Sequence, residues 1–243
     1  MTIMRSSTIV GAALCCTLAG AIAFAQDTKS SKPATQSTAP TASAPAAANQ
    51  GGLPEGFELP PGMTEEEFAQ CMSTCQPAEM HEWLSADAGS WTGKCTSWMS
   101  PGAKPEQTEC TLTVTPTMGG RFFQSQINAI WPGMGPYEGF CITGYDNVSG
   151  QFQSTWCDSC GTGMAIGTGE LSSDKTTLTL NYTFNCPMKK GPVNMREVFT
   201  RTGPNTTTME LWFPAQDTGK EFKMMEVAYT RCVPTTTTQA NAR

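Results

Sequence analysis

Histidine is nearly absent from this sequence. The 243 residues include a single His, at position 81, which excludes most acid–base catalysis and most metal sites that depend on imidazole. Charged residues make up 15% of the chain, and its net charge is −6. An acidic chain offers no basic surface to nucleic acid or to anionic lipid. We therefore expect no nucleic-acid partner, and we expect neither a metal nor another cofactor.

Long apolar runs are also scarce, and the one clear example lies at the N-terminus. Arg5 is the only charge among the first 25 residues, and an apolar stretch runs from Ile9 to Phe24 and ends in the small-x-small sequence Ala23-Phe24-Ala25. This pattern predicts a signal peptide over residues 1–25. Lipidation within the stretch and a retained anchor are the alternatives. We expect an exported protein, periplasmic or extracellular, with no membrane span after cleavage.

The next segment lacks the large apolar residues that a folded core requires. Residues 26–62 are dominated by Ala, Pro, Ser, Thr and Gly, and Phe57 is their only aromatic residue. Such a segment cannot bury enough surface to offset its ordering entropy. We predict a disordered linker over residues 26–62, a disordered tail over 233–243, and one folded domain over 63–232.

The folded domain should begin with a short helical lead. Thr64 can cap a first helix, and Glu67 lies three residues on as its capping-box partner. Pro77 can end this helix and begin a second one. The large apolar side chains of the lead are Phe68, Met72, Met80, Trp83 and Leu84. We predict that Trp83 and Leu84 pack against one end of the strand-rich body that follows.

From residue 91 onward the apolar pattern has a period of two. The segment 177–186 is the clearest case, since apolar residues alternate there with Thr and Asn. About ten strands are expected, over 91–99, 107–117, 120–131, 137–146, 151–158, 163–171, 175–186, 193–202, 205–213 and 219–231. Many short antiparallel strands with tight turns predict an all-β sandwich or an up-and-down barrel.

The order of several short motifs resembles a known bacterial family. The motifs are His81-x-x-Leu84, Gly89-x-Trp91-x-Gly93, Met118–Phe122, Gly144–Asp146, Trp156-x-Asp158-Ser159-x-Gly161-Thr162, Arg196 with Val198, and Tyr229-x-Arg231. Together they resemble the family called domain of unknown function 1579. The resemblance implies a lipocalin-like (calycin-type) antiparallel barrel of about ten strands and no established activity. The sequence departs from the family pattern by placing Cys at 157 and 160.

Eleven cysteines are many for a chain of this length, and they favour an oxidising compartment. Two residues of a hairpin face each other when they lie equally far from the centre of its turn. This rule predicts three disulfide pairs: Cys95–Cys110, Cys141–Cys157 and Cys160–Cys186. The alternative is that these cysteines are buried and free, as small apolar residues.

Three further cysteines, Cys71, Cys75 and Cys232, have no hairpin partner, and one of the first two could bond the third. A redox role for the Cys157–Cys160 pair is less favoured, because reactive pairs of that spacing usually open a helix whereas this pair follows a strand. A zinc site would normally need a second such pair.

No catalytic set is apparent in the sequence. A Ser–His–Asp arrangement would need His81 to reach Asp158 and Ser159 from the helical lead, and a capping or mouth-lining role for His81 is favoured over catalysis. An enzymatic function is therefore a less favoured alternative.

The aromatic residues of the predicted strands give the best indication of function. The candidate pocket residues are Trp91, Phe123, Phe140, Trp156, Asp158, Tyr182 and Phe184. They could simply fill the core, but a ten-stranded barrel is wide enough to leave a cavity. The favoured hypothesis is a non-enzymatic exported barrel that binds a small hydrophobic ligand. The alternative is a structural or interaction module of the cell envelope, tethered by its linker.

Overall fold

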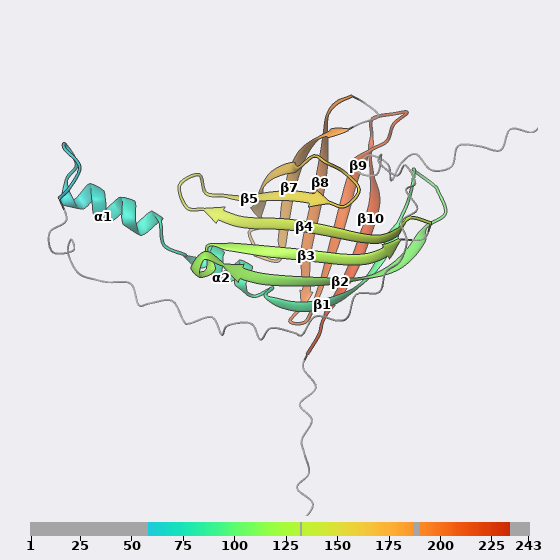
Figure 1. Ribbon diagram of the computed structural model, residues 1–243, viewed down its shortest axis with the longest axis horizontal. Helices are drawn as coiled ribbons and strands as arrows, with labels where there is room; N and C mark the ends of the chain where they lie inside the picture. The colour runs from blue at the N-terminus through green and yellow to red at the C-terminus, as the bar shows by residue number, and fades with distance from the viewer. Residues whose placement is uncertain (1–57, 132, 187–189, 234–243) are drawn as a thin grey trace, which may run out of the picture. The chain divides into compact units, whose positions relative to one another are not determined.

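The structure is a computed structural model, and it describes residues 58–131, 133–186 and 190–233. The expected signal peptide, most of the linker and nearly all of the tail lie outside the described residues. Two helices come first in the described chain, α1 (Glu65–Thr74) and α2 (Glu79–Ser85). A strand-rich body follows them (Figure 1).

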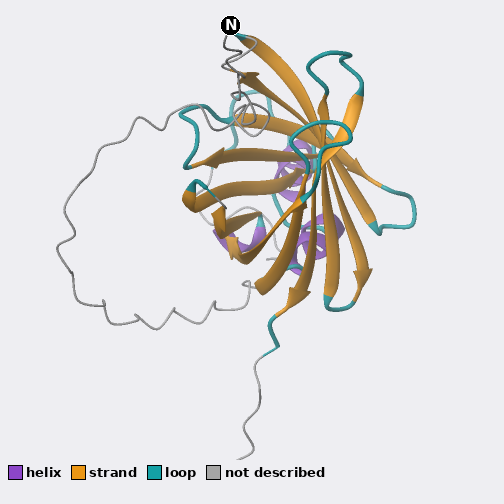
Figure 2. Cartoon of the chain, turned by 90° about the vertical axis from the view of Figure 1, so that its right-hand side faces the viewer, coloured by secondary structure: helices purple, strands orange, loops and turns teal. Residues whose placement is uncertain are grey.

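Ten antiparallel strands form one closed barrel, in which each strand pairs with its sequence neighbours and β1 pairs with β10. Figure 2 shows these strands in orange. The strands are β1 (Gly89–Ser97), β2 (Glu106–Thr117), β3 (Phe122–Trp131), β4 (Gly135–Asp146), β5 (Gln151–Asp158), β6 (Ala165–Leu171), β7 (Thr177–Cys186), β8 (Gly191–Gly203), β9 (Thr206–Pro214) and β10 (Glu221–Arg231). The predicted all-β, up-and-down barrel is confirmed. Each strand boundary lies within two residues of its expected place.

The period-two pattern places one row of each strand inside the barrel. In β1, Trp91 and Cys95 are buried, whereas Thr92 and Lys94 between them are exposed. Glycines make room for the largest inward side chains. A Cβ atom at Gly167, directly opposite Tyr182, would lie 2.7 Å from the Tyr182 ring. Large inward side chains therefore pack directly against the backbone at the glycines, although side chains do not fill the whole interior.

The first helix has the predicted start. The Oγ1 atom of Thr64 accepts a hydrogen bond from the Glu67 amide at 3.2 Å, and the Glu67 carboxylate accepts one from the Thr64 amide at 2.8 Å. This is the predicted capping box. The helix contains no buried residue, and Met72 is exposed.

The second helix packs on the barrel as predicted. Trp83 and Leu84 are buried, and Trp83 makes an edge contact with Phe152 of β5 at a centroid distance of 5.7 Å. Its indole Nε1 donates a hydrogen bond to the Lys175 carbonyl in the β6–β7 turn. Arg201, at the end of β8, forms a hydrogen-bonded ion pair with Asp87, just after α2. Helix α2 thus closes one end of the barrel.

The expected hairpin registers were wrong, although the hairpins themselves are correct. The β4–β5 turn holds four residues and places Asp146 opposite Gln151. Cys141 therefore pairs with Trp156, not with Cys157. A slip of one residue moves a side chain to the other face of a strand. Cys157 pairs with Phe140 instead, so Cys141 and Cys157 do not face each other.

The other two predicted pairs are also out of register. In the β1–β2 hairpin, Cys95 pairs with Thr108 and Cys110 pairs with Gly93, so the two cysteines are diagonal neighbours on the inner face. Cys160 precedes β6, which begins at Ala165, and is not paired with Cys186.

The structure forms no disulfide among the nine described cysteines: Cys71, Cys75, Cys95, Cys110, Cys141, Cys157, Cys160, Cys186 and Cys232. The sequence arithmetic failed because it assumed the turn centres, and an error of half a residue in a centre changes which side chains face each other.

Candidate ligand cavity

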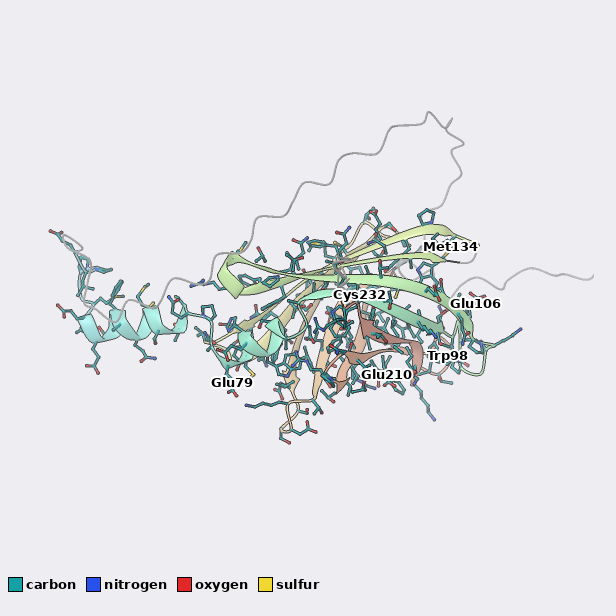
Figure 3. All side chains as sticks on the ribbon, turned by 90° about the horizontal axis from the view of Figure 1, so that it is seen from below. Glu79, Trp98, Glu106, Met134, Glu210 and Cys232 are labelled. Atoms are coloured by element: carbon teal, nitrogen blue, oxygen red, sulfur yellow. The ribbon has the colours of Figure 1, made fainter. Side chains whose placement is uncertain are left out.

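The barrel interior holds a cavity of about 390 Å³. Its wall is mainly apolar and takes residues from α2 and from all ten strands. Trp83 and Leu84 of α2 line the cavity at the closed end. Met134 and Met164 line it at the other end, where both are exposed to solvent. Figure 3 shows Met134 at the end of the barrel opposite Glu79 of α2. The cavity therefore opens at the end that lacks the helix.

Most of the residues proposed from the sequence for the pocket lie on the cavity wall. These are Trp91, Phe123, Trp156, Asp158, Tyr182 and Phe184. Phe140 differs, because it lies in the outward row of β4, paired with Cys157, and is absent from the cavity wall. Its neighbours Gly139 and Cys141 occupy the inward row. The placement of Phe140 in the pocket was wrong because the predicted β4–β5 register is off by one residue, which moves this side chain to the other face of the strand.

Asp158, near the open end, is fully engaged in hydrogen bonds. Its Oδ2 atom accepts from the Trp156 indole at 3.1 Å and from the Tyr137 hydroxyl at 3.4 Å. Its Oδ1 atom accepts from the Cys160 amide at 2.9 Å. Burial raises the pKa of Tyr137, so this hydroxyl stays a donor at neutral pH. Asp158 therefore joins two aromatic side chains of the cavity wall, Trp156 and Tyr137, to the loop that follows β5.

Ser159 continues this arrangement. Its amide donates to the Glu138 carbonyl at 2.8 Å, and its Oγ atom accepts from the Glu138 amide at 3.1 Å. The pair of hydrogen bonds extends the β4–β5 ladder past the end of β5. The segment from Trp156 to Ser159 thus has a structural role at the mouth.

His81 lies at the other end of the barrel, in α2. Its Nδ1 atom accepts a hydrogen bond from the Ala78 amide at 3.1 Å and so caps the helix. Burial lowers the pKa of the imidazole, which keeps the ring neutral. His81 does not meet Asp158 or Ser159, so the triad considered from the sequence is not formed. The favoured capping role of His81 is confirmed.

A polar network that the sequence did not suggest crosses the inner face of β4, β5 and β7. The Tyr182 hydroxyl donates to Ser154 Oγ at 2.8 Å, and Ser154 Oγ lies 2.9 Å from Thr143 Oγ1. The Cys141 Sγ atom lies 3.1 Å from Ser154 Oγ and 3.2 Å from Thr143 Oγ1. Every member has a partner, so the network fixes this wall without leaving a polar group free.

Glu197 of β8 is the second feature missed from the sequence. It occupies an inward position, paired with Leu180 of β7 and Leu211 of β9, and it lines the cavity. Burial raises the pKa of its carboxyl group to about 7. An acid in the inward row of a predicted strand, between Met195 and Phe199, was the available signal. The pocket residues predicted from the sequence were mainly aromatic and did not include Glu197.

Among residues 58–131, 133–186 and 190–233, no group of three or more His, Cys, Asp or Glu side chains could hold a metal ion. None of the helices in the same ranges is long and apolar enough to cross a bilayer.

Several solved structures are similar to this chain. Rv2717c from M. tuberculosis is 15% identical, with a TM-score of 0.49 over 65% of this chain and 100% of its own. The S-type phycobiliprotein lyase CPES from Guillardia theta is 11% identical, with a TM-score of 0.48 over 64% of this chain and 94% of its own.

A redesigned β-barrel, b11L5F_LGL, is 10% identical, with a TM-score of 0.35 over 64% of this chain and 100% of its own. No curated protein matches the chain. The family described as "Protein of unknown function (DUF1579)" matches residues 76–231, which span α2 and the whole barrel. The chain therefore belongs to the DUF1579 family.

Proposed function

We propose that this protein is an exported, non-enzymatic barrel that binds a small hydrophobic ligand inside the barrel. The observation that carries the proposal is the cavity of about 390 Å³ with its mainly apolar wall. Small-molecule sites typically measure about 300–1,000 Å³ and have apolar walls with a few placed polar groups. The cavity lies within this range.

The architecture fits a barrel with a ligand-binding cavity better than a barrel filled by its own side chains. One end is closed by Trp83 and Leu84 of α2, and the other end has the exposed methionines Met134 and Met164 at its rim. Methionine is flexible and polarizable, which suits a rim that adapts to different shapes. The interior polar network and Asp158 are held by the protein itself, so most of the polar wall needs no ligand to satisfy it.

Export is supported by the sequence of residues 1–25, with its single positive charge, apolar core and Ala-Phe-Ala end. The alternative of a tethered structural or interaction module stays a prediction from the linker composition.

The proposal is tested with N-phenyl-1-naphthylamine, a neutral dye whose fluorescence rises in apolar surroundings. The purified chain should enhance its emission with saturable binding. Ala129→Phe, on the inner face of β3, should fill part of the cavity and weaken dye binding. Asn128→Phe, on the outer face of the same strand, is the matched control and should leave binding unchanged.

Far-UV circular dichroism and thermal melting should first show that both variants are folded. Ser125→Leu gives a second, smaller filling of the same β3 wall if Ala129→Phe fails to fold. Failure of the wild-type chain to bind the dye, or equal dye binding by the inward and outward variants, would overturn the proposal.

A further inference from the structure

The cavity wall contains acids and no bases. Its carboxyl groups are Asp87, Asp158 and Glu197, and no Lys, Arg or His of the described chain lines it. Asp87 is paired with Arg201, and Asp158 accepts hydrogen bonds from Trp156, Tyr137 and the Cys160 amide. Glu197 makes no hydrogen bond or ion pair with any described residue. It is therefore the acid of the wall that the fold leaves without a partner.

The immediate neighbours of Glu197 cannot supply one. Leu180 and Leu211 lie beside it on the adjacent strands, and both line the same cavity. The side chain keeps part of its surface accessible, and an inward position turns that surface toward the cavity. A buried carboxylate without a partner is costly, because it loses its hydration. A donor that enters the cavity would remove this cost.

The titratable groups that face Glu197 are Tyr182 of β7, Tyr229 of β10 and Cys141 of β4. Burial raises the pKa of all three, that of Cys141 to about 11. All three are neutral at physiological pH, so none of them is a cation that could neutralise the carboxylate. From β9 the facing side chains are apolar, and so are Met195 and Phe199 on β8 itself.

We propose that Glu197 is the anchor for a protonated amine, so that the ligand is a small lipophilic amine whose apolar body fills the aromatic part of the cavity. This inference rests on the proposed function and narrows its ligand class. The ammonium N–H groups would donate to the Glu197 carboxylate as charge-assisted hydrogen bonds. The same carboxylate would repel a fatty acid, whose head group carries the same charge.

Binding should be linked to a proton. A carboxyl group with a pKa of about 7 is largely protonated in the empty cavity at pH 6. When a protonated amine binds, Glu197 ionises and one proton is released to the solvent, while the amine keeps its own. The affinity for the amine should therefore rise between pH 6 and pH 8.

The test is displacement of N-phenyl-1-naphthylamine by three probes of equal chain length: decylamine, decanol and decanoate. At pH 8 the wild-type chain should bind decylamine about tenfold more tightly than decanol, the increment expected for one charged hydrogen bond. Decanoate should bind most weakly. Glu197→Gln keeps the shape of the side chain and should remove the preference, so that decylamine and decanol bind alike.

Glu170→Gln, at an exposed position of β6, is the matched control and should keep the wild-type preference. Isothermal titration in two buffers of different ionisation enthalpy at pH 6 should show proton release with the wild-type chain and none with Glu197→Gln. If the dye binds but decylamine shows no preference, or if Glu197→Gln keeps the preference, this inference fails and the hydrophobic-ligand proposal stands. If the dye does not bind the wild-type chain, both fail.

Discussion

The guanidinium of Arg201 lies 3.6 Å from the centroid of the Trp83 ring, over its face. The same guanidinium pairs with Asp87, and both charged side chains are mostly buried. One arginine at the end of β8 thus holds the aromatic plug of α2 and neutralises the acid that follows it. The closed end of the cavity depends on this contact.

Arg201→Ala should destabilise the protein by about 2 kcal/mol, because it leaves Asp87 partly buried without its partner. Urea unfolding monitored by tryptophan fluorescence measures the change. Arg196→Ala is the matched control, since Arg196 also lies on β8, pairs with Glu221 and contacts a tryptophan, Trp212, but is more exposed. Its cost should be about 0.5 kcal/mol, as for surface ion pairs. Equal costs would show that α2 is not anchored by Arg201.

The two helices should differ in what their removal costs. A chain that begins at Gln76 lacks α1, which has no buried residue, and should melt like a chain that begins at Met63. A chain that begins at Gly89 also lacks α2 and loses the burial of Trp83 and Leu84, about 3–5 kcal/mol at roughly 1.5–3 kcal/mol per large side chain. Differential scanning calorimetry of the three chains measures this, and equal melting of all three would contradict the plug.

Asp158 should matter for stability because it is the shared acceptor for two aromatic side chains. Asp158→Ala leaves the Trp156 indole, the Tyr137 hydroxyl and the Cys160 amide without their acceptor. Each unsatisfied group costs about 1–3 kcal/mol when it stays buried, although groups near the mouth can turn to water. We expect a loss of about 2 kcal/mol in urea unfolding, with partial recovery in Asp158→Asn. An unchanged midpoint in Asp158→Ala would show that the mouth does not depend on this residue.

The number of reactive thiols tests directly whether the chain forms disulfides. Ellman's reagent should react quickly in the native protein with the exposed Cys71, Cys75 and Cys232. It should react slowly with Cys95 and Cys141, because burial raises the pKa of these thiols to about 12 and about 11. In denaturant and without reductant, the chain lacking residues 1–25 should show nine thiols, as the structure has them. A count of three or fewer would restore disulfide pairing.

Period-two alternation predicted the ten strands, and the large apolar side chains of residues 64–86 predicted the docking of Trp83 and Leu84. These features depend on local pattern and on burial, which the sequence carries directly. The register of each hairpin depends on the geometry of its turn, which the sequence constrains only to within a residue. An error of one residue in the β4–β5 register placed Phe140 on the wrong face and paired Cys141 with Cys157.

Glu197 shows a different limit of sequence reasoning. Its strand was predicted, but its position on the inner face was not used. A single acid in a strand is usually a solvated residue, and the closed barrel shows that this one faces the cavity. The polar network of Tyr182, Ser154 and Thr143 was hidden in the same way, since it joins three strands whose relative offsets the sequence does not supply.

The last prediction concerns the pH dependence of stability. The pKa of Glu197 is about 7 in the folded chain and is near its ordinary value of 4.5 in the unfolded chain. Well below pH 4.5 the carboxyl group is protonated in both states and does not affect stability. As the pH rises toward 7, the Glu197 carboxyl group ionises in the unfolded chain but stays protonated in the folded one, so the free energy of unfolding falls.

Glu197→Gln removes this loss. The variant should nearly match the wild type at pH 4 and exceed it by about 3 kcal/mol at pH 8, from guanidinium unfolding at both values. Glu170→Gln should show no such change between the two pH values. Decylamine should recover stability for the wild type at pH 8 and much less for Glu197→Gln, because it supplies the missing partner. If the wild type is as stable as Glu197→Gln at pH 8, the Glu197 carboxylate is already paired or hydrated in the folded chain. The cavity would then hold no unpaired charge for an amine to bind.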